Sequence, residues 1–322
     1  MKTLKNYLLP AVILLLLTVG GCGRKWAEEN KGSFSIIRNE NGQTLGFSPA
    51  SGIEILTVKG LAFKDLNKNG RLDPYEDWRL PVNERALDLA SRMSVEQIAG
   101  LMLYSSHQSI PSAGGGFGPG ATYGGKPYAE SGALPGDLSD QQKKFLTEDN
   151  LRHVLITSVE SPEVAAIWNN NAQAFVEGTG LGIPINTSSD PRHGSDSYAE
   201  YNAGAGGEIS MWPGTLGIAA SFDPELMRRF GEVASMEYRA LGIATALSPQ
   251  IDLATEPRWS RFDGTMGEDP DLATDMARAY VDGFQTSEGE AHIADGWGYH
   301  SVNAMVKHWP GGGPEEGGRD GH

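Results

Sequence analysis

The sequence predicts an α/β protein built on a parallel sheet. From about residue 81 onward, short β-prone runs alternate with longer stretches of helical periodicity, which is typical of βαβ units. Two arrangements fit this alternation, a closed eightfold barrel and an open doubly wound sheet. The chain has no Gly-x-Gly-x-x-Gly sequence after the first strand and no Walker A sequence, so the nucleotide-binding forms of the open sheet are disfavoured.

The expected helices have apolar residues at helical spacing and recognisable first turns. Ser94 is an N-cap signal, Ser161-Pro162 is a favoured N-terminal pair, and Asp-Pro pairs at residues 223 and 269 open two more helices. We expect helices over residues 82–93, 94–103, 139–147, 162–176, 223–241 and 269–284.

The expected strands are short and are followed by polar residues. They cover residues 153–157, 183–186, 217–220, 243–247 and 302–306. In barrels the functional residues gather just after the carboxyl ends of the strands. Ser188-Ser189-Asp190, Arg258-Trp259-Ser260-Arg261 and Lys307-His308 follow this rule, which favours the barrel.

The printed sequence ends at His322 without a helix stop signal or a final strand. A barrel that lacked its last units would expose strand edges and apolar faces. We therefore expect the barrel to be incomplete in this chain and the sequence to be truncated.

Charge and cysteine content limit the possible partners. The chain of 322 residues carries a formal net charge of −15 and has no basic stripe, so nucleic acid is not an expected partner. Cys22 is the only cysteine, which excludes an internal disulfide.

Residues 1–22 have the features of a secretory signal. Lys2 and Lys5 precede an apolar run over residues 8–19, which is shorter than the roughly 20 residues of a membrane span. Cys22 follows small residues and resembles a lipobox cysteine, which would be lipidated and anchor the protein to a membrane. We expect a lipoprotein of the bacterial envelope, periplasmic or in the outer membrane, with 23–32 as a polar tether in an extension over 23–60. An uncleaved anchor is the alternative.

An acidic loop within residues 61–80 has the ligand spacing of an EF-hand. Oxygen ligands are expected at positions 1, 3, 5, 9 and 12, a glycine at position 6 and a backbone carbonyl at position 7. The candidates are Asp65, Asn67, Asn69, Arg71 through its carbonyl, Asp73 and Glu76, with Gly70 at the turn. Residues 60–64 do not predict an entering helix, so we expect a structural Ca²⁺ clip. A polar turn rich in Asn and Asp is the alternative.

Five stretches in order resemble family 3 glycoside hydrolases and together cover about residues 80–322. They are Gly182-Ile183-Pro184 with Asp190-Pro191-Arg192-His193-Gly194; Trp212-Pro213-Gly214-Thr215; Ser221-Phe222-Asp223; Glu256-Pro257-Arg258-Trp259-Ser260-Arg261 with Gly267-Glu268-Asp269-Pro270; and Lys307-His308-Trp309-Pro310-Gly311. The resemblance implies a (β/α)8 barrel over 81–322, incomplete in this chain.

The resemblance also implies a sugar pocket. Its substrate-binding residues would be Asp190, Arg261, Lys307, His308 and Arg319. Ser260 departs from the family, in which glycine is usual at that position. The nucleophilic aspartate and the acid/base glutamate of the family are expected after His322, so no catalytic residue is assigned within the chain. No cofactor is implied for catalysis.

The implied activity is that of a retaining exo-β-glycosidase acting on a glycoside or oligosaccharide, with terminal β-D-glucose as the expected sugar. A β-xylosidase and a β-N-acetylglucosaminidase are alternatives. In the latter, Asp320-Gly321-His322 would loosely match the family's Asp-His pair, with His322 in the acid/base role. Two non-enzymatic alternatives are a carbohydrate-binding lipoprotein without catalysis and a calcium-stabilised structural module.

Overall fold

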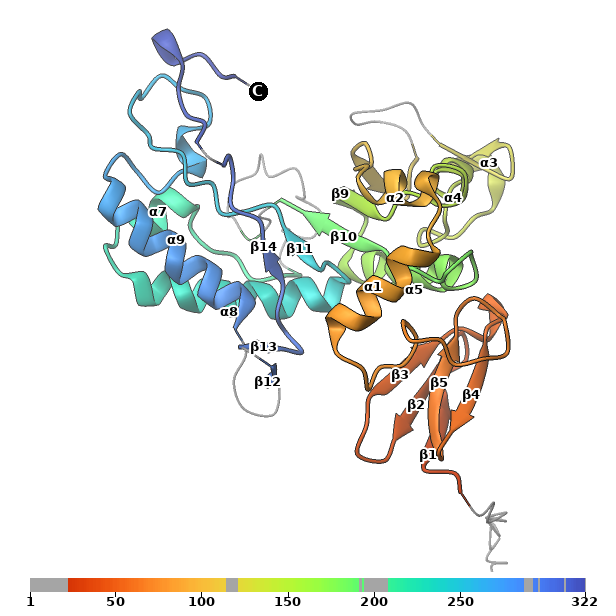
Figure 1. Cartoon of the computed structure of the whole chain (residues 1–322). Helices are drawn as coiled ribbons and strands as arrows, with labels where there is room; N and C mark the ends of the chain where they lie inside the picture. Colours follow the sequence, from red (N-terminus) through yellow and green to blue (C-terminus); the bar gives the residue numbers. More distant parts are fainter. Residues whose placement is uncertain are drawn as a thin grey trace, which may run out of the picture.

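The computed structural model describes residues 23–113, 121–190, 193, 208–286, 292–294, 296–309 and 311–321. A group of antiparallel strands comes first in the chain and lies beside a larger α/β part, as the red and orange segment of Figure 1 shows. No helix in these described ranges is long and apolar enough to cross a bilayer.

The N-terminal strands form two small antiparallel sheets. One has the order β1 (Trp26–Asn30), β2 (Ser35–Asn39) and β3 (Thr44–Phe47), and the other is the hairpin of β4 (Glu54–Val58) and β5 (Leu61–Asp65). The side chain of Asn39 joins the two sheets: its Nδ2 donates to the Ala62 oxygen at 3.3 Å, and the Ala62 N–H donates to its Oδ1 at 2.7 Å.

The expectation of a polar tether over residues 23–32 was wrong where β1 lies. Trp26–Asn30 pairs in register with the residues of β2, although four of its five side chains are exposed. The polar sequence of this segment therefore reflects the solvent-facing edge of a sheet, because backbone pairing holds the strand in place without a buried side chain at each position.

The larger part is built on a five-stranded parallel sheet. Its strands are β6 (Gln108–Ile110), β9 (His153–Val159), β10 (Asn186–Ser189), β11 (Thr245–Ala246) and β14 (Asn303–Ala304). The spatial order is β14-β11-β10-β9-β6, so each strand lies next to the strand of this sheet that follows it in the chain, and all four pairings are parallel. This confirms the prediction of an incomplete (β/α) barrel.

Helices connect the strands of the parallel sheet. They are α5 (Pro162–Glu177) between β9 and β10, α7 (Thr215–Ala219) and α8 (Pro224–Leu241) between β10 and β11, and α9 (Pro270–Gln285) between β11 and β14. The predicted helix starts are confirmed: the side chains of Ser161, Asp223 and Asp269 each accept hydrogen bonds from the first turn of their helix.

Smaller elements complete the described chain. The helices are α1 (Val82–Arg92), α2 (Val95–Leu101), α3 (Tyr128–Ser131) and α4 (Asp140–Thr147), with 3₁₀ turns at η1 (Pro49–Ser51), η2 (Phe262–Gly264) and η4 (Glu316–Gly318). Two hairpins pair β7 (Thr122–Tyr123) with β8 (Lys126–Pro127), and β12 (His292–Ala294) with β13 (Trp297–Gly298). Ser94 and Ser139 each form a capping box, which explains where α2 and α4 begin.

One predicted strand is a helix. Residues 217–220 overlap α7, in which the Ile218 N–H donates to the Gly214 oxygen at 3.0 Å and the Ala220 N–H donates to the Leu216 oxygen at 2.9 Å. A four-residue apolar run fits a buried strand and a buried helical turn equally well, so its pattern could not decide between them. The strand expected over 183–186 also begins later, at Asn186.

The core of the α/β part extends from β9 and α5 to α8 and α9. Within it α8 packs on α9, and the two helices lie side by side in Figure 1. Aromatic rings meet across this contact: the ring centroids of Phe230 on α8 and Tyr280 on α9 lie 5.7 Å apart. Gly231 and Gly283 meet at the crossing: a Cβ on Gly283 would lie 2.2 Å from the Arg228 backbone oxygen. A side chain at either position would force the helices apart.

Charged groups hold the N-terminal strands against the end of α5. Lys64 Nζ lies 2.6 Å from Glu177 Oε1, and Glu177 Oε2 accepts the Ser48 N–H at 2.9 Å. Lys68 Nζ donates to the oxygens of Ser51, at 2.9 Å, and Gly178, at 3.0 Å. A lysine at the carboxyl end of a helix satisfies free carbonyls and interacts favourably with the helix dipole.

We expect Gly283→Ala to lower the free energy of unfolding by about 1–3 kcal/mol, because overpacking at the backbone contact outweighs the helix propensity that alanine gains, about 1 kcal/mol. Denaturant titration followed by circular dichroism measures this change. Gly46→Ala is the control, since a Cβ there has nothing within 4 Å. Equal stability of the two variants would contradict the close crossing of α8 and α9.

Candidate functional site

The predicted site residues come together at the carboxyl edge of the parallel sheet. Asp190 directly follows β10, and Lys307 and His308 come three and four residues after β14, which lies two strands away. Between these strands lies β11, whose carboxyl end leads through Gln250 to Asp252. Because neighbouring parallel strands end on the same side, segments more than a hundred residues apart in the chain meet there.

Asp190 and Lys307 form an ion pair. Lys307 Nζ lies 2.5 Å from Asp190 Oδ1, and the two side chains are 20% and 25% exposed respectively. The backbone of Asp190 is held as well, because the Tyr238 hydroxyl on α8 donates to its carbonyl oxygen. The pair thus has a fixed position and remains partly open to solvent, so a ligand with hydroxyl groups can reach both charges.

Two phenols lie near this carboxylate: Tyr104, which is 44% exposed, and Tyr280, which is buried. The Tyr104 hydroxyl contacts the Ser188 hydroxyl, and burial raises the pKa of Tyr104, with a further increase from the Asp190 charge. Burial also raises the pKa of Tyr280, whose hydroxyl contacts Ser248 Oγ at 2.5 Å, and Asp190 again adds to the increase. Both phenols therefore stay neutral at physiological pH and act through hydrogen bonds.

His308 is held by a buried acid that the sequence analysis missed. Its Nδ1 lies 2.7 Å from Asp252 Oδ2, and the Asp252 side chain is 0% exposed. Burial disfavours the charged form of Asp252, but hydrogen bonds from the His308 ring and from the N–H groups of Gly312 and His308 outweigh this and lower its pKa. Asp252 comes six residues after β11, at the same edge of the sheet as Asp190, and its place after a predicted strand was the one weak signal in the sequence.

The two predicted arginines lie in neighbouring loops. Arg261 directly precedes η2 and its Nε is buried without a hydrogen-bond partner among the described residues, while its carbonyl accepts from Gln250 Nε2 at 3.4 Å. Arg319 follows η4, and its carbonyl accepts the Glu315 N–H at 3.0 Å. The Trp259 Nε1–H donates to Asp320 Oδ1 at 3.2 Å, which packs the two loops together.

Some predicted residues lie outside the described ranges. They are Cys22, the candidate lipidation site; His322, the alternative acid/base; and Pro191, Arg192, Gly194 and Pro310 of the family motifs. His193 is described: its ring is buried with Nε2 at 2.8 Å from Glu237 Oε2, and burial lowers its pKa although Glu237 opposes this effect.

The acidic loop of residues 65–76 is ordered by hydrogen bonds to its carboxylates. Glu76 accepts the N–H groups of Leu66 (2.8 Å), Asn67 (3.3 Å) and Asp73 (3.0 Å), while Asp65 accepts those of Asn69 and Gly70. Burial raises the pKa of the Glu76 carboxyl despite these three donors.

The amide groups of the loop face one of its carboxylates. Asn67 Nδ2 and Asn69 Nδ2 both donate to Asp73 Oδ2 at 2.7 Å. Within the described ranges, no group of three His, Cys, Asp or Glu side chains is placed to hold a metal ion. A cation here would therefore need amide and carbonyl oxygens, which a half-turn of each Asn side-chain amide would supply.

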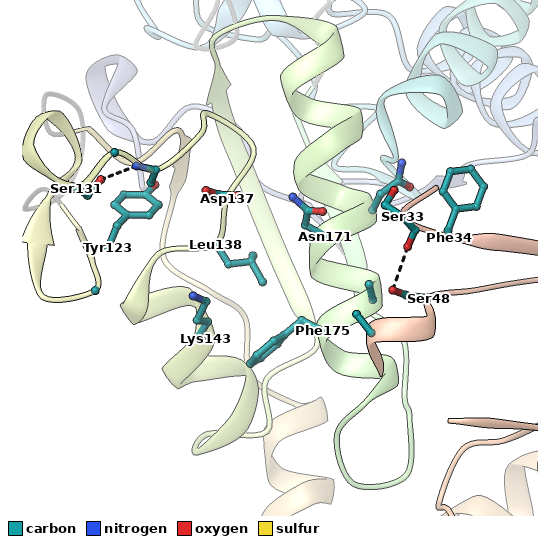
Figure 2. Close-up of a pocket in the computed structure, with 16 residues that line it drawn as sticks. Ser33, Phe34, Ser48, Tyr123, Ser131, Asp137, Leu138, Lys143, Asn171 and Phe175 are labelled. Atoms are coloured by element: carbon teal, nitrogen blue, oxygen red, sulfur yellow. Dashed lines mark hydrogen bonds between the residues drawn. The ribbon is translucent and has the colours of Figure 1, made fainter. Parts of the chain in front are cut away.

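Two hollows lie away from the Asp190–Lys307 pair, against α5. Figure 2 shows the first, of about 810 Å³: Phe34 and Ser48 from the N-terminal strands lie on one side of α5, and Tyr123 and Ser131 on the other. The second, of about 840 Å³, lies between the N-terminal strands and α5 and includes Trp78 and Tyr299. The linings of these two hollows include none of the predicted sugar-binding residues.

Comparison with known proteins places the chain in a family. Residues 126–322 match the glycosyl hydrolase family 3 N-terminal domain. A periplasmic β-glucosidase/β-xylosidase from Dickeya chrysanthemi is 45% identical over 273 residues, which cover 84% of this chain and 38% of that protein. Emericella nidulans β-glucosidase C is 38% identical over 276 residues, covering 82% and 39%.

A solved structure agrees with this assignment. A β-glucosidase from Erythrobacter marinus superposes with a TM-score of 0.55 and 26% identity, covering 77% of this chain and 28% of that one. The chain spans less than two fifths of the length of the curated relatives described above. The family domain covers more than half of the chain, and its parallel sheet carries Asp190, Lys307 and His308 at one edge, so this chain belongs to glycosyl hydrolase family 3.

Proposed function

We propose that this chain forms the sugar-binding part of a retaining exo-β-glycosidase that releases terminal, non-reducing β-D-glucosyl residues. The observation that carries the proposal is the partly exposed Asp190–Lys307 ion pair beside the anchored ring of His308. Family membership and the printed names of the relatives, β-glucosidase and β-glucosidase/β-xylosidase, support the same class of reaction.

The chemistry of the pair suits a polyhydroxylated ligand. An ionised carboxylate only accepts hydrogen bonds, an ammonium group only donates them, and each sugar hydroxyl can do both. Adjacent hydroxyls of a terminal sugar would therefore bind between Asp190 and Lys307. Hydrogen bonds to charged groups are stronger than neutral ones, which favours a site that recognises one sugar face closely.

The proposed reaction needs two more groups. Retention requires a nucleophilic carboxylate and a second carboxyl group as acid/base, about 5–5.5 Å apart. We assign neither role to a described residue of this chain, and we propose that both groups come from sequence after His322. The part of the protein described here would then bind and orient the sugar for attack at its anomeric carbon.

We expect Asp190→Ala in the full-length gene product to lower kcat/KM for an aryl β-D-glucoside by about 10²- to 10⁴-fold, the equivalent of losing two hydrogen bonds to a charged group. Asp275→Ala, on the exposed face of α9, is the matched control and should keep wild-type kinetics. An unchanged kcat/KM for Asp190→Ala would reject the role of Asp190.

The same assay separates the alternatives. Aryl β-D-xyloside and aryl N-acetyl-β-D-glucosaminide are tested in parallel. If kcat/KM is higher for either than for the glucoside, that substrate's sugar becomes the proposed one in place of glucose. Binding of glucose without turnover of any of the three substrates would favour a carbohydrate-binding protein over an enzyme.

We propose further that the protein is exported and anchored through acyl chains on Cys22. The basic start, the short apolar run and the cysteine after small residues support this, and the Dickeya relative is named periplasmic. We expect Cys22→Ser to move the protein from the membrane fraction to the soluble fraction of fractionated cells, because no acyl chain can then be attached. Equal amounts of both proteins in the membrane fraction would contradict the anchor.

We also propose that the loop of residues 65–76 binds Ca²⁺ as a structural ion. For a dissociation constant of 10⁻⁴–10⁻³ M, 10 mM Ca²⁺ should stabilise the protein by about 1.4–2.7 kcal/mol, which thermal melting detects as a rise in Tm. Glu76→Gln keeps acceptors for the backbone but removes the charge, and should abolish the rise. Glu54→Ala, outside the loop, should keep it, and a wild-type Tm that ignores both Ca²⁺ and chelator would reject the site.

A further inference from the structure

We propose that Glu237 on α8 is a positioning residue that holds the chain on the carboxyl side of Asp190 and so fixes the Asp190 carboxylate for the sugar. The effect on the sugar rests on the proposed function, whereas the hold on the chain can be measured without any substrate. Glu237 lies outside the predicted site residues, and its proposed action on Asp190 passes through the backbone that joins Asp190 to His193.

The Glu237 carboxylate brings together two parts of the stretch between β10 and α7. Its Oε1 accepts the Ser210 N–H at 2.9 Å, and its Oε2 accepts the Ser210 hydroxyl at 2.8 Å. Nε2 of His193 lies 2.8 Å from the same Oε2. A carboxylate suits this role because each of its oxygens can accept more than one hydrogen bond. Ser210 and His193 are thus held at one side chain of α8.

Backbone and ring contacts reinforce this arrangement. The Trp212 N–H donates to the His193 oxygen at 2.6 Å, and the Trp212 indole N–H donates to Ser210 Oγ at 3.0 Å. The Trp212 ring meets Phe230 on α8 edge-on, with ring centroids 5.5 Å apart. The buried ring of His193 has its centroid 5.1 Å from that of Tyr238. Glu237 therefore contacts an imidazole ring that is itself packed against α8.

Asp190 lies between points that are held on either side. On its amino side it directly follows β10, which pairs with β11. Its own carbonyl oxygen accepts the hydroxyl of Tyr238. On its carboxyl side, His193 comes three residues later and contacts Glu237, the neighbour of Tyr238 in α8. Loss of the Glu237 contacts would free the carboxyl side and let the Asp190 carboxylate turn away from Lys307.

A positioning role and a role in stability alone predict different effects. A carboxylate that recognises a sugar must be held to within about 0.5 Å of its working position. If Glu237 acts by placing the Asp190 carboxylate, its removal matters only while that carboxylate is present. If Glu237 only stabilises the fold, its removal matters equally with and without the carboxylate.

A double-mutant cycle in the full-length gene product separates these roles. We expect Glu237→Ala to lower kcat/KM for an activated aryl β-D-glucoside by about tenfold or more, but by less than about twofold in the Asp190→Ala background, where no carboxylate is left to misplace. Glu232→Ala, on the same helix, is the matched control and should keep wild-type kinetics. Equal losses in both backgrounds would overturn the positioning role.

Hydrogen exchange in the same gene product tests the hold on the chain without substrate. Glu237→Ala should speed exchange of the Trp212 amide by about tenfold or more, because its acceptor on His193 is no longer fixed. The Leu247 amide, which donates to the Ser189 oxygen at 2.9 Å, should exchange at the wild-type rate. An unchanged rate at Trp212, or an equal increase at Leu247, would overturn the proposal.

The two measurements fail independently. If no β-D-glycoside is turned over, the proposed function fails, while exchange at Trp212 still decides the hold on the chain. Faster exchange at Trp212 with equal kinetic losses in both backgrounds would refute the effect on the sugar. If Glu237→Ala does not fold, Ser210→Ala replaces it in both experiments. That variant lacks the hydroxyl contact with Oε2, so we expect a loss of about two- to tenfold with the same dependence on Asp190, and the same outcomes overturn the proposal.

Discussion

The parallel pairing of β10, β11 and β14 is the constraint on which the site depends. None of the site residues is close to the others in sequence except Lys307 and His308. The sheet brings the carboxyl ends of its strands to one edge, and the Asp190–Lys307 and Asp252–His308 contacts then follow. α8 supports this edge, because the Tyr238 hydroxyl on α8 donates to the backbone oxygen of Asp190.

Signals confined to a few residues were predictable from the sequence, whereas features that depend on partners far away in the chain were not. Asp223-Pro224 and Asp269-Pro270 mark helix starts by local chemistry, and both are confirmed. Residues 217–220 are too few and too evenly apolar to distinguish a helical from a strand periodicity. Four of the five side chains of β1 are exposed, so its sequence carries no alternation of buried and exposed residues, and only backbone pairing shows the strand. The parallel sheet was predicted because its alternation with helices repeats along the chain.

The same distinction applies to the site. Asp190, Lys307 and His308 were found through motifs, and the structure adds their mutual arrangement. Asp252 was missed because a single acid six residues after a short strand looks like any loop residue until its fold partner is known. Asp252 contacts His308 and Gly312, which are 56 and 60 residues away in the chain. Local sequence does not reveal such contacts.

The lysine contacts at the end of α5 limit where the protein can be shortened from its N-terminus. Lys64 and Lys68 lie in the first 80 residues, yet their partners include Glu177 and Gly178 at the helix that leads from β9 to β10. A protein started at residue 81 would leave the buried Glu177 carboxylate without its cation and the Gly178 carbonyl without its lysine donor. The antiparallel strands and α5 therefore share one set of charged contacts, which a boundary at residue 81 would cut.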